Sequence, residues 1–287
     1  MKKTIFLVLM ISMILLTGCI KRDKMEDINI ISTIYPIEYV AKRLYGEYSN
    51  ISTIYPRSTN IEEYNITKKQ LKDFSENDLF IYNGESNEKD YATNMLDNNK
   101  NLKIIDAAYG LEATNADSDV WMNPANILMI AQNIKNELSN LISNPYIVEE
   151  IENNYNLLKV DVSELETELK KAADSSKDKR IITLDESLKF LEKYGFTVIN
   201  LTEDKTNKEN NIELAKSIYS KGELTYLFIH EHIEDNDVMT DLINNYGAKT
   251  LEFRTMTTIT EDDIDTNSDY LSIMNDNITN LKEETYK

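Results

Sequence analysis

The sequence predicts an α/β protein with two lobes, each a roughly four-stranded parallel sheet with covering helices, joined by one long rigid helix. Short runs of β-branched and aromatic residues alternate with helical patterns along the chain, which indicates βαβ units around parallel sheets. One helical pattern, over residues 145–175, is far longer than the others. The 269 residues that follow a predicted signal peptide exceed the size at which one hydrophobic core usually stops growing, which favours two lobes.

Residues 1–18 are predicted to be a signal peptide. Lys2 and Lys3 form a basic start, and the twelve-residue apolar run Ile5–Leu16 is interrupted only by Ser12. This run is shorter than the ~20 apolar residues of a membrane-spanning helix. It has the dimensions of a secretory signal.

The segment Leu16-Thr17-Gly18-Cys19 resembles the bacterial lipobox, whose cysteine becomes the lipidated N-terminus after cleavage. Cys19 is the only cysteine, so an intramolecular disulfide is excluded. We expect an extracytoplasmic protein anchored to the cell membrane by lipidated Cys19, with residues 19–27 as the lipidated tether. A short uncleaved anchor with an incidental cysteine is the alternative.

The chain is strongly acidic. Its formal net charge of −19 becomes −21, from 29 basic and 50 acidic residues, once Lys2 and Lys3 leave with the signal peptide. A surface of this sign repels a phosphate backbone, so nucleic acid is excluded as a partner.

Residues 28–144 form the predicted N-terminal α/β lobe. The hexapeptide Ile-Ser-Thr-Ile-Tyr-Pro occurs at 31–36 and again at 51–56, and we interpret the two copies as neighbouring strands rather than as a repeat architecture. Thr67 is expected to cap a helix that ends at Phe74. The lobe is predicted to contain strands at 28–35, 51–56, 78–82 and 102–105, with helices at 36–45, 67–74 and 124–142.

Residues 145–175 are predicted to be the linking helix, because their apolar residues recur at steps of three or four. Such a helix can run along two lobes and hold them at a nearly fixed angle, whereas a coiled-coil dimer seam is the alternative. Residues 176–287 form the predicted C-terminal α/β lobe. It is expected to contain strands at 180–183, 197–201, 225–229 and 249–253, and helices at 186–194, 211–220, 236–246 and 270–281.

Several stretches, in order from about Ile28 to Leu281, resemble the solute-binding lipoproteins of bacterial ABC importers for zinc and manganese. The segment ISTIYPIEYVAKRLYGE is similar to that family's opening strand and helix, and DSDVWMNPANILMIAQNI to its Asp-x-His-Val-Trp-Leu-Asp-Pro segment. LDESLKFLEKYGF, LFIHEHIED and TITEDDIDTNSDYLSIMNDNITNL resemble its later landmarks. The resemblance implies a metal receptor that closes its two lobes on an ion.

The positions that carry this family's usual metal ligands hold other residues here. Glu62 and Asp119 stand where the resemblance places two histidines. Leu184, which cannot ligate a metal, stands at the third position, and Arg254 stands at the fourth, usually an aspartate.

One hypothesis is that Arg254 replaces the cation. Glu62, Asp119 and Arg254 together carry a charge of −1 without any ion. A guanidinium can pair bidentately with carboxylates, so Arg254 is expected to link Glu62 and Asp119 of one lobe to the other. The protein would then be a degenerate paralogue without a metal site, serving as a surface interaction or adhesion lipoprotein.

The competing hypothesis keeps a metal. Glu62, Asp119 and Asp185 supply oxygen ligands, and His230, where the resemblance has a glutamate, supplies nitrogen. A mixed oxygen and nitrogen set suits a divalent zinc or manganese ion. The only two histidines, His230 and His232, lie two residues apart in a segment expected to be extended, so their side chains should point the same way.

Each of these features also has an explanation without a ligand. A solvent-facing His-Glu-His at the start of a loop needs no metal, and Glu62 and Asp119 could belong to acidic loops of an acidic protein. Enzyme motifs are missing: no two glycines are closer than 25 residues, which excludes a P-loop and a dinucleotide fingerprint, and there is no Gly-x-Ser-x-Gly. We therefore expect no enzyme.

The resemblance implies an extracytoplasmic substrate-binding lipoprotein of a metal ABC transporter. Its implied partners are an ABC permease with its ATPase, the membrane through the lipid anchor, and a divalent zinc or manganese ion.

Overall fold

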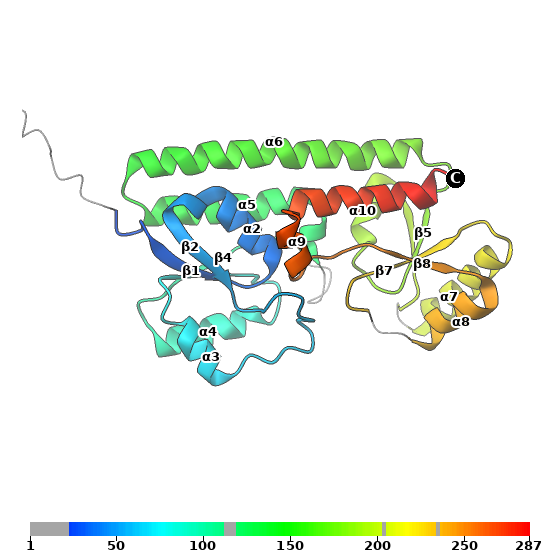
Figure 1. Cartoon of the computed structure of the whole chain (residues 1–287), viewed down its shortest axis with the longest axis horizontal. Coiled ribbons are helices and arrows are strands. Elements are labelled where there is room, and N and C mark those ends of the chain that lie inside the picture. Colours follow the sequence, from blue (N-terminus) through cyan, green and yellow to red (C-terminus); the bar gives the residue numbers. More distant parts are fainter. Residues whose placement is uncertain (1–22, 112–118, 203–204, 234–235) are drawn as a thin grey trace, which may run out of the picture.

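The computed structural model describes residues 23–111, 119–202, 205–233 and 236–287, and it confirms the predicted fold class. Two four-stranded parallel sheets lie side by side, and one long helix spans both (Figure 1). The predicted signal peptide and Cys19 lie outside the described residues. Within the described residues, no helix combines the length and the apolar character that a bilayer crossing requires.

The N-terminal sheet has the strand order β2-β1-β3-β4, with all neighbours parallel. Ile31 pairs with Ser52, so the two copies of the hexapeptide do lie on neighbouring strands, offset by one residue. The four strands are β1 (Ile28–Ser32), β2 (Ser49–Thr53), β3 (Leu79–Tyr82) and β4 (Lys103–Asp106).

Local caps explain where the helices of this lobe begin. Pro36 occupies the first turn of α2, where its missing N–H costs nothing. Thr67 and Gln70 form a reciprocal capping box at α3, and Asn123 caps α5 through the Ala125 N–H. The elements are α2 (Tyr35–Tyr45), η1 (Gly46–Tyr48), α3 (Lys68–Phe74), α4 (Glu88–Asn98), η2 (Val120–Met122) and α5 (Pro124–Leu141).

The C-terminal sheet repeats the same topology, with the order β6-β5-β7-β8. The predicted helix at 186–194 is wrong in type, because only a 3-10 helix over Lys189–Tyr194 forms before Gly195 turns left-handed at φ 90°. The remaining elements are β5 (Arg180–Thr183), β6 (Thr197–Asn200), β7 (Tyr226–Ile229), β8 (Lys249–Glu252), α7 (Lys205–Ser220), α8 (Asp237–Tyr246), α9 (Glu261–Asp265) and α10 (Tyr270–Thr285).

The helix α6 (Pro145–Ser175) has 31 residues and extends ~46 Å at 1.5 Å per residue. Figure 1 shows it running over α5 of the first lobe and α10 at the second. Its buried residues belong to a hydrophobic core that continues from the N-terminal lobe to Ile181, Phe228 and Phe253 of the other lobe. A shared core of this kind holds two lobes at a fixed angle, because moving one against the other would open packed surface.

The chain also returns from the second lobe to the first in residues 254–259. There the Tyr35 N–H donates to the Thr257 carbonyl at 3.0 Å, and the Ser58 N–H donates to the Ile259 carbonyl at 3.1 Å. The Tyr270 hydroxyl of α10 donates to the Trp121 carbonyl at 2.7 Å. Both connections join the lobes without a flexible linker.

Candidate metal centre

Four acidic residues follow strands of the two sheets, on loops that converge between the lobes. Glu62 lies in the loop after β2, and Asp119 precedes the 3-10 helix η2 beyond β4. Asp185 and Glu231 follow β5 and β7, which are neighbours in the C-terminal sheet. The carboxyl ends of parallel strands, at the point where strand order reverses, are where α/β folds bind ligands.

Charges from loops of both lobes act on Asp119. Burial is the largest cause that raises the pKa of the Asp119 carboxyl well above its usual value, and the charges of Asp185, Glu231 and Glu62 raise it further. The charges of the predicted residues Glu62 and Asp185 therefore both act on Asp119, although the three residues come from different lobes. Glu231 belongs to the same cluster.

Asp185 and His230 face each other in the second lobe. The Oδ1 atom of Asp185 accepts the Ser187 N–H at 2.7 Å, whereas its Oδ2 is enclosed and has no hydrogen-bond partner among the described residues. That oxygen lies 3.8 Å from the Nε2 atom of His230, which is too long for a hydrogen bond. An enclosed carboxylate oxygen without a partner is costly, so this pair has unused capacity to bind a cation.

The expectation that His230 and His232 lie in an extended segment is wrong. Strand β7 ends at Ile229, and the chain turns at once, so that the His232 N–H donates to the Nδ1 of His230 at 3.2 Å. Nδ1 therefore acts as an acceptor, and a neutral ring carries its proton on Nε2, facing Asp185. Ligation of a metal through Nε2 requires the other tautomer, with this turn bond released.

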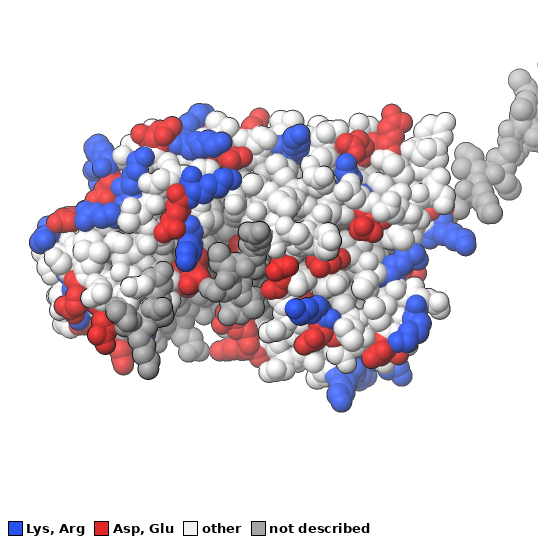
Figure 2. All heavy atoms as spheres, turned by 180° about the vertical axis from the view of Figure 1, so that it is seen from behind, with Lys and Arg blue, Asp and Glu red and all other residues white. Residues whose placement is uncertain are grey.

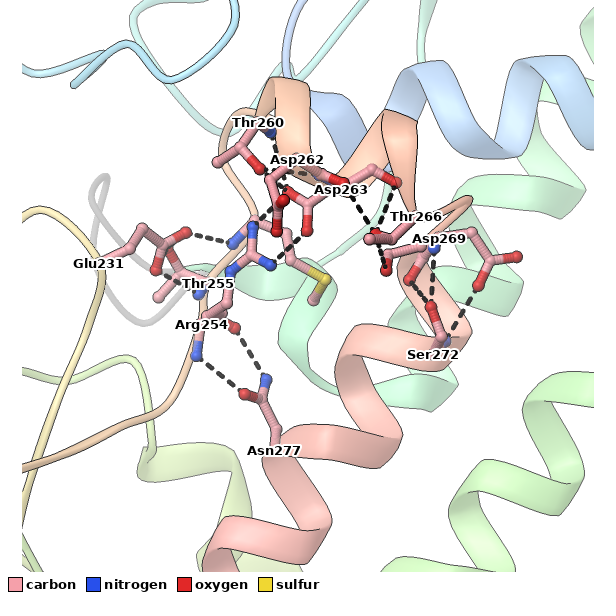
Figure 3. A network of polar contacts seen from close by, with 12 residues as sticks. Glu231, Arg254, Thr255, Thr260, Asp262, Asp263, Thr266, Asp269, Ser272 and Asn277 are labelled. Carbon is pink, nitrogen blue, oxygen red and sulfur yellow. Dashed lines mark hydrogen bonds and ion pairs between the residues drawn. The ribbon is translucent and has the colours of Figure 1, made fainter.

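Glu231, the residue between the two histidines, binds backbone N–H groups of the segment that follows β8, the last strand of the second lobe. The Glu231 carboxylate accepts the N–H groups of Thr255 and Met256, each at 2.7 Å, and lies 3.3 Å from the Thr255 hydroxyl. Figure 3 shows it facing residues 254–256 from the opposite side to Asn277. Sequence reasoning passed over Glu231 because alternation along an assumed strand placed it away from the histidines.

The hypothesis that Arg254 replaces the cation is contradicted by its contacts. Both terminal nitrogens of its guanidinium bind Asp263 at 2.7 Å, and no ion pair joins it to Glu62 or Asp119, all of which are described (Figure 3). This pair holds the pKa of Asp263 to about 2, chiefly through the Arg254 hydrogen bonds. Asp263 also caps α9 with Thr260, and the charge of Arg254 is neutralised by a residue nine positions further along the chain.

The surface agrees with an acidic junction between the lobes. Figure 2 shows Asp and Glu side chains exposed low in the middle of the molecule, where the two lobes meet. Glu62 is exposed, Asp119 and Asp185 are half-buried, and the His230 side chain is 25% exposed. The cluster can therefore be reached from solvent.

A family model described as "Zinc-uptake complex component A periplasmic", or ZnuA, matches residues 30–284. The chain belongs to this family.

Three curated relatives illustrate the range of ZnuA-like sequences to which the chain is similar. It is 22% identical to the zinc-binding lipoprotein AdcA of Streptococcus pneumoniae over 99% of this chain and 61% of AdcA, so it spans about three fifths of that relative. It is 22% identical to the high-affinity zinc uptake system protein ZnuA of Bacillus subtilis over 91% of this chain and 88% of that one. It is 27% identical to the manganese ABC transporter substrate-binding lipoprotein PsaA of S. pneumoniae over 82% and 83%.

Solved structures show the same fold. The Zn(II)-bound ZnuA-like domain of S. pneumoniae AdcA aligns over 91% of this chain and all of that one, with a TM-score of 0.75 at 22% identity. The metal-dependent lipoprotein YcdH of B. subtilis aligns over 91% and 100%, with a TM-score of 0.76 at 20% identity. The laminin-binding protein Lbp of Streptococcus pyogenes aligns over 91% and 99%, with a TM-score of 0.73 at 17% identity.

Two atoms of the donor set of this ZnuA-family chain, Asp185 Oδ2 and His230 Nε2, are spaced closely enough to share a metal ion. Bonds of about 2.0–2.2 Å to oxygen and nitrogen allow one ion to contact two atoms up to ~4.2 Å apart. The 3.8 Å between Asp185 Oδ2 and His230 Nε2 fits that span. Within the described residues, however, no three His, Cys, Asp or Glu side chains are already spaced to enclose an ion. Binding of one ion by all four candidates would require Glu62 and Asp119 to move inward.

Proposed function

We propose that the protein is the extracytoplasmic receptor of an ABC importer for a divalent transition metal, zinc or manganese. It captures the ion between its two lobes and delivers it to a permease that works with an ATPase. The ion is bound by Glu62, Asp119, Asp185 and His230. The protein transports its ligand and performs no catalysis.

The observation that carries this proposal is the enclosed Oδ2 atom of Asp185. Among the residues that the structure describes it has no hydrogen-bond partner. It faces the imidazole of His230, and the charge of Asp185 acts on Asp119. A divalent cation placed there would satisfy the orphaned oxygen and remove the repulsion among the carboxylates. The names of the relatives, which include zinc and manganese receptors, support the same class of ligand.

The chemistry of the ligands tunes the choice of ion. Carboxylate oxygens suit manganese, whereas imidazole and thiolate favour zinc, and the proposed set contains three carboxylates and one imidazole. Compared with a site rich in histidine, this set should prefer zinc over manganese by a smaller factor.

We further propose that the protein works at the outer face of the cell membrane, anchored through lipidated Cys19. The lipobox-like segment Leu16–Cys19 supports this location, as does the word lipoprotein in the names of two relatives. Asp23, four residues after Cys19, accepts the N–H groups of Met25, Ser143 and Asn144, so the tether is fastened to the first lobe close to its anchor.

Calorimetric titration of the full chain in detergent with Zn²⁺ and with Mn²⁺ tests the proposal. We expect a dissociation constant below about 1 µM for at least one ion. Asp185→Asn and His230→Ala should each weaken binding at least tenfold, and Glu62→Ala should weaken it less because Glu62 is exposed. Glu209→Gln, which changes an exposed carboxylate on α7, should bind as the parent does.

The proposal is rejected if neither ion binds, or if Asp185→Asn and His230→Ala bind as tightly as the parent. In that case the second candidate stands: a surface interaction lipoprotein without a metal site. The observation that favours it is that His230 Nδ1 accepts a backbone N–H, which leaves Nε2 protonated in the neutral ring.

A further inference from the structure

Residues 254–259, here called the crossing segment, touch both walls of the metal centre. Towards the first lobe, the Trp121 indole N–H donates to the Thr255 carbonyl at 2.7 Å. The Thr258 hydroxyl donates to the Thr59 carbonyl at 3.1 Å, close to Glu62 in the same loop. Towards the second lobe, Asn277 binds both the N–H and the carbonyl of Arg254 at 2.8 Å.

Glu231 fixes the centre of the crossing segment. Its carboxylate accepts two consecutive N–H groups, those of Thr255 and Met256. Met256 is completely buried and has φ 61°, a left-handed conformation that costs energy for a residue with a side chain. Successive N–H groups that converge at such a left-handed residue form an anion-binding concavity, and Glu231 fills it with its own carboxylate.

Three loops of the metal centre are thus fastened to one short stretch of backbone. Asp119 lies two residues before Trp121, which binds the Thr255 carbonyl. His230 is the neighbour of Glu231, which binds the Thr255 N–H. The N–H and the carbonyl of a single residue, Thr255, therefore connect a ligand loop of one lobe with a ligand loop of the other.

We propose that Glu231 is a positioning residue, which holds the crossing segment in the conformation that aligns the loops of Asp119, His230 and Glu62 for binding a divalent ion. This inference rests on the proposed function for its ligand, but its structural part stands alone. The lobes share a rigid core, so alignment of the ligand loops depends on these local bonds more than on rotation of the lobes. A misplacement of about 1 Å is enough to weaken a constellation of this kind severely.

The first test uses Trp121, the only tryptophan of the chain, as a reporter. Glu231→Gln keeps the shape of the side chain but replaces one carboxylate oxygen by an NH₂ group. This group is a donor and would face a backbone N–H, which is also a donor. We expect the metal-free variant to show a red-shifted Trp121 emission and faster quenching by iodide, because its bond to Thr255 loosens. The matched control, Glu209→Gln on the exposed face of α7, should have the emission of the parent.

The second test measures affinity for Zn²⁺ and Mn²⁺ in a double-mutant cycle. Glu231→Gln and Trp121→Phe, which keeps a ring but loses the indole N–H, should each weaken binding about tenfold. Because both act through Thr255, the double variant should bind about as weakly as either single variant, whereas independent sites give additive losses.

Unchanged Trp121 emission in Glu231→Gln, or additive losses in the cycle, would overturn the inference. If Glu231 were instead a direct ligand, affinity would fall in Glu231→Gln while Trp121 emission stayed as in the parent and Trp121→Phe bound normally. If the parent binds no metal, the proposed function fails, and the emission of the metal-free variant still decides whether Glu231 positions the crossing segment.

Discussion

Asp119 is the residue on which the electrostatics of the centre converge. Burial and the three carboxylates around it raise its pKa, so its ionised form is less favourable in the folded protein than in the unfolded chain. A raised carboxyl pKa lowers stability as the pH rises above the unfolded value, which is 3.8 here. At neutral pH an aspartate at position 119 is therefore less favourable for the folded state than a neutral residue of the same shape.

Asp119→Asn should raise the melting temperature at pH 7 by several degrees, since ~1 kcal/mol corresponds to about 2–4 °C in a chain of this size. The gain should shrink as the pH falls towards 4, where the parent is protonated at this site. The same variant should lose at least tenfold in affinity for Mn²⁺ or Zn²⁺. Calorimetric melting and titration check both results, and a melting temperature that falls at pH 7 would contradict the account.

Glu88 gives a separate pH dependence, far from the ligand loops in sequence. Burial raises its pKa to about 7, although its carboxylate accepts the Asn83 N–H at 2.9 Å. Because the folded pKa exceeds the unfolded value of 4.5, stability should decline as the pH rises from there through about 7. The decline attributable to Glu88 is on the order of 3 kcal/mol.

Glu88→Gln should remove this decline, so that the variant is more stable than the parent at pH 8 and close to it at pH 5. Urea unfolding at the two pH values measures the difference. A variant that is less stable than the parent at pH 8 would show that the ionised carboxylate is well solvated or paired.

At the residue scale, sequence resemblance was enough to select Glu62, Asp119, Asp185 and His230 as candidates, but not to decide what each does. Arg254 was misjudged because its partner, Asp263, lies nine residues further on and serves as a helix cap, which charge counting alone does not reveal. Glu231 was missed because a turn, not a strand, follows Ile229.

At the scale of elements, α6 determines how the lobes behave. Its buried residues, such as Leu158 with no exposed surface, pack in a core that extends into both lobes. Unfolding of one lobe should therefore expose buried residues of α6 that also pack against the other lobe. We expect one cooperative transition instead of two.

Leu158→Ala should cost 2–5 kcal/mol, because it leaves a cavity in that core. Leu157→Ala is the matched control: Leu157 is the preceding residue of the same helix, 62% exposed, and its loss should change stability by less than about 0.5 kcal/mol. Denaturant unfolding followed by far-ultraviolet circular dichroism and by Trp121 fluorescence should give coincident curves for parent and variants. Separate transitions would mean that the lobes fold independently.

Strong local signals made some elements predictable. The capping box at Thr67 and the regular apolar spacing of α6 correspond to the observed helices. Helix α4 escaped prediction because only Glu88, Ala92 and Met95 of it are buried, which leaves no clear apolar stripe. The predicted helix at 186–194 forms only as a 3-10 helix over Lys189–Tyr194, and Gly195 ends it as expected from its left-handed conformation.

At the scale of the whole molecule, two sheets of the same strand order place the carboxyl ends of their strands towards a common junction. Alternating strand and helix patterns were enough to predict this architecture, since parallel sheets need crossover helices. The return of residues 254–259 to the first lobe was not predictable, because it depends on hydrogen bonds to Tyr35, Ser58 and Trp121 that are distant in sequence.

The two lobes are held by a shared core. In the proposed receptor, adjustment on ligand binding is therefore expected in the ligand loops and not in the lobes. Under the proposed function, the acidic junction would attract divalent cations from solution, and the Oδ2 atom of Asp185, which has no hydrogen-bond partner among the described residues, would be the point where an ion binds. The proposed receptor function requires that a divalent ion binds between Asp185, His230 and Asp119.

Anomalous diffraction from crystals grown with Mn²⁺ tests that claim most directly. We expect an anomalous peak within about 2.0–2.3 Å of Asp185 Oδ2 and His230 Nε2, with the Asp119 carboxylate drawn into contact. Crystals that show no peak there, with Asp185 and His230 still 3.8 Å apart or directly hydrogen-bonded, would contradict it.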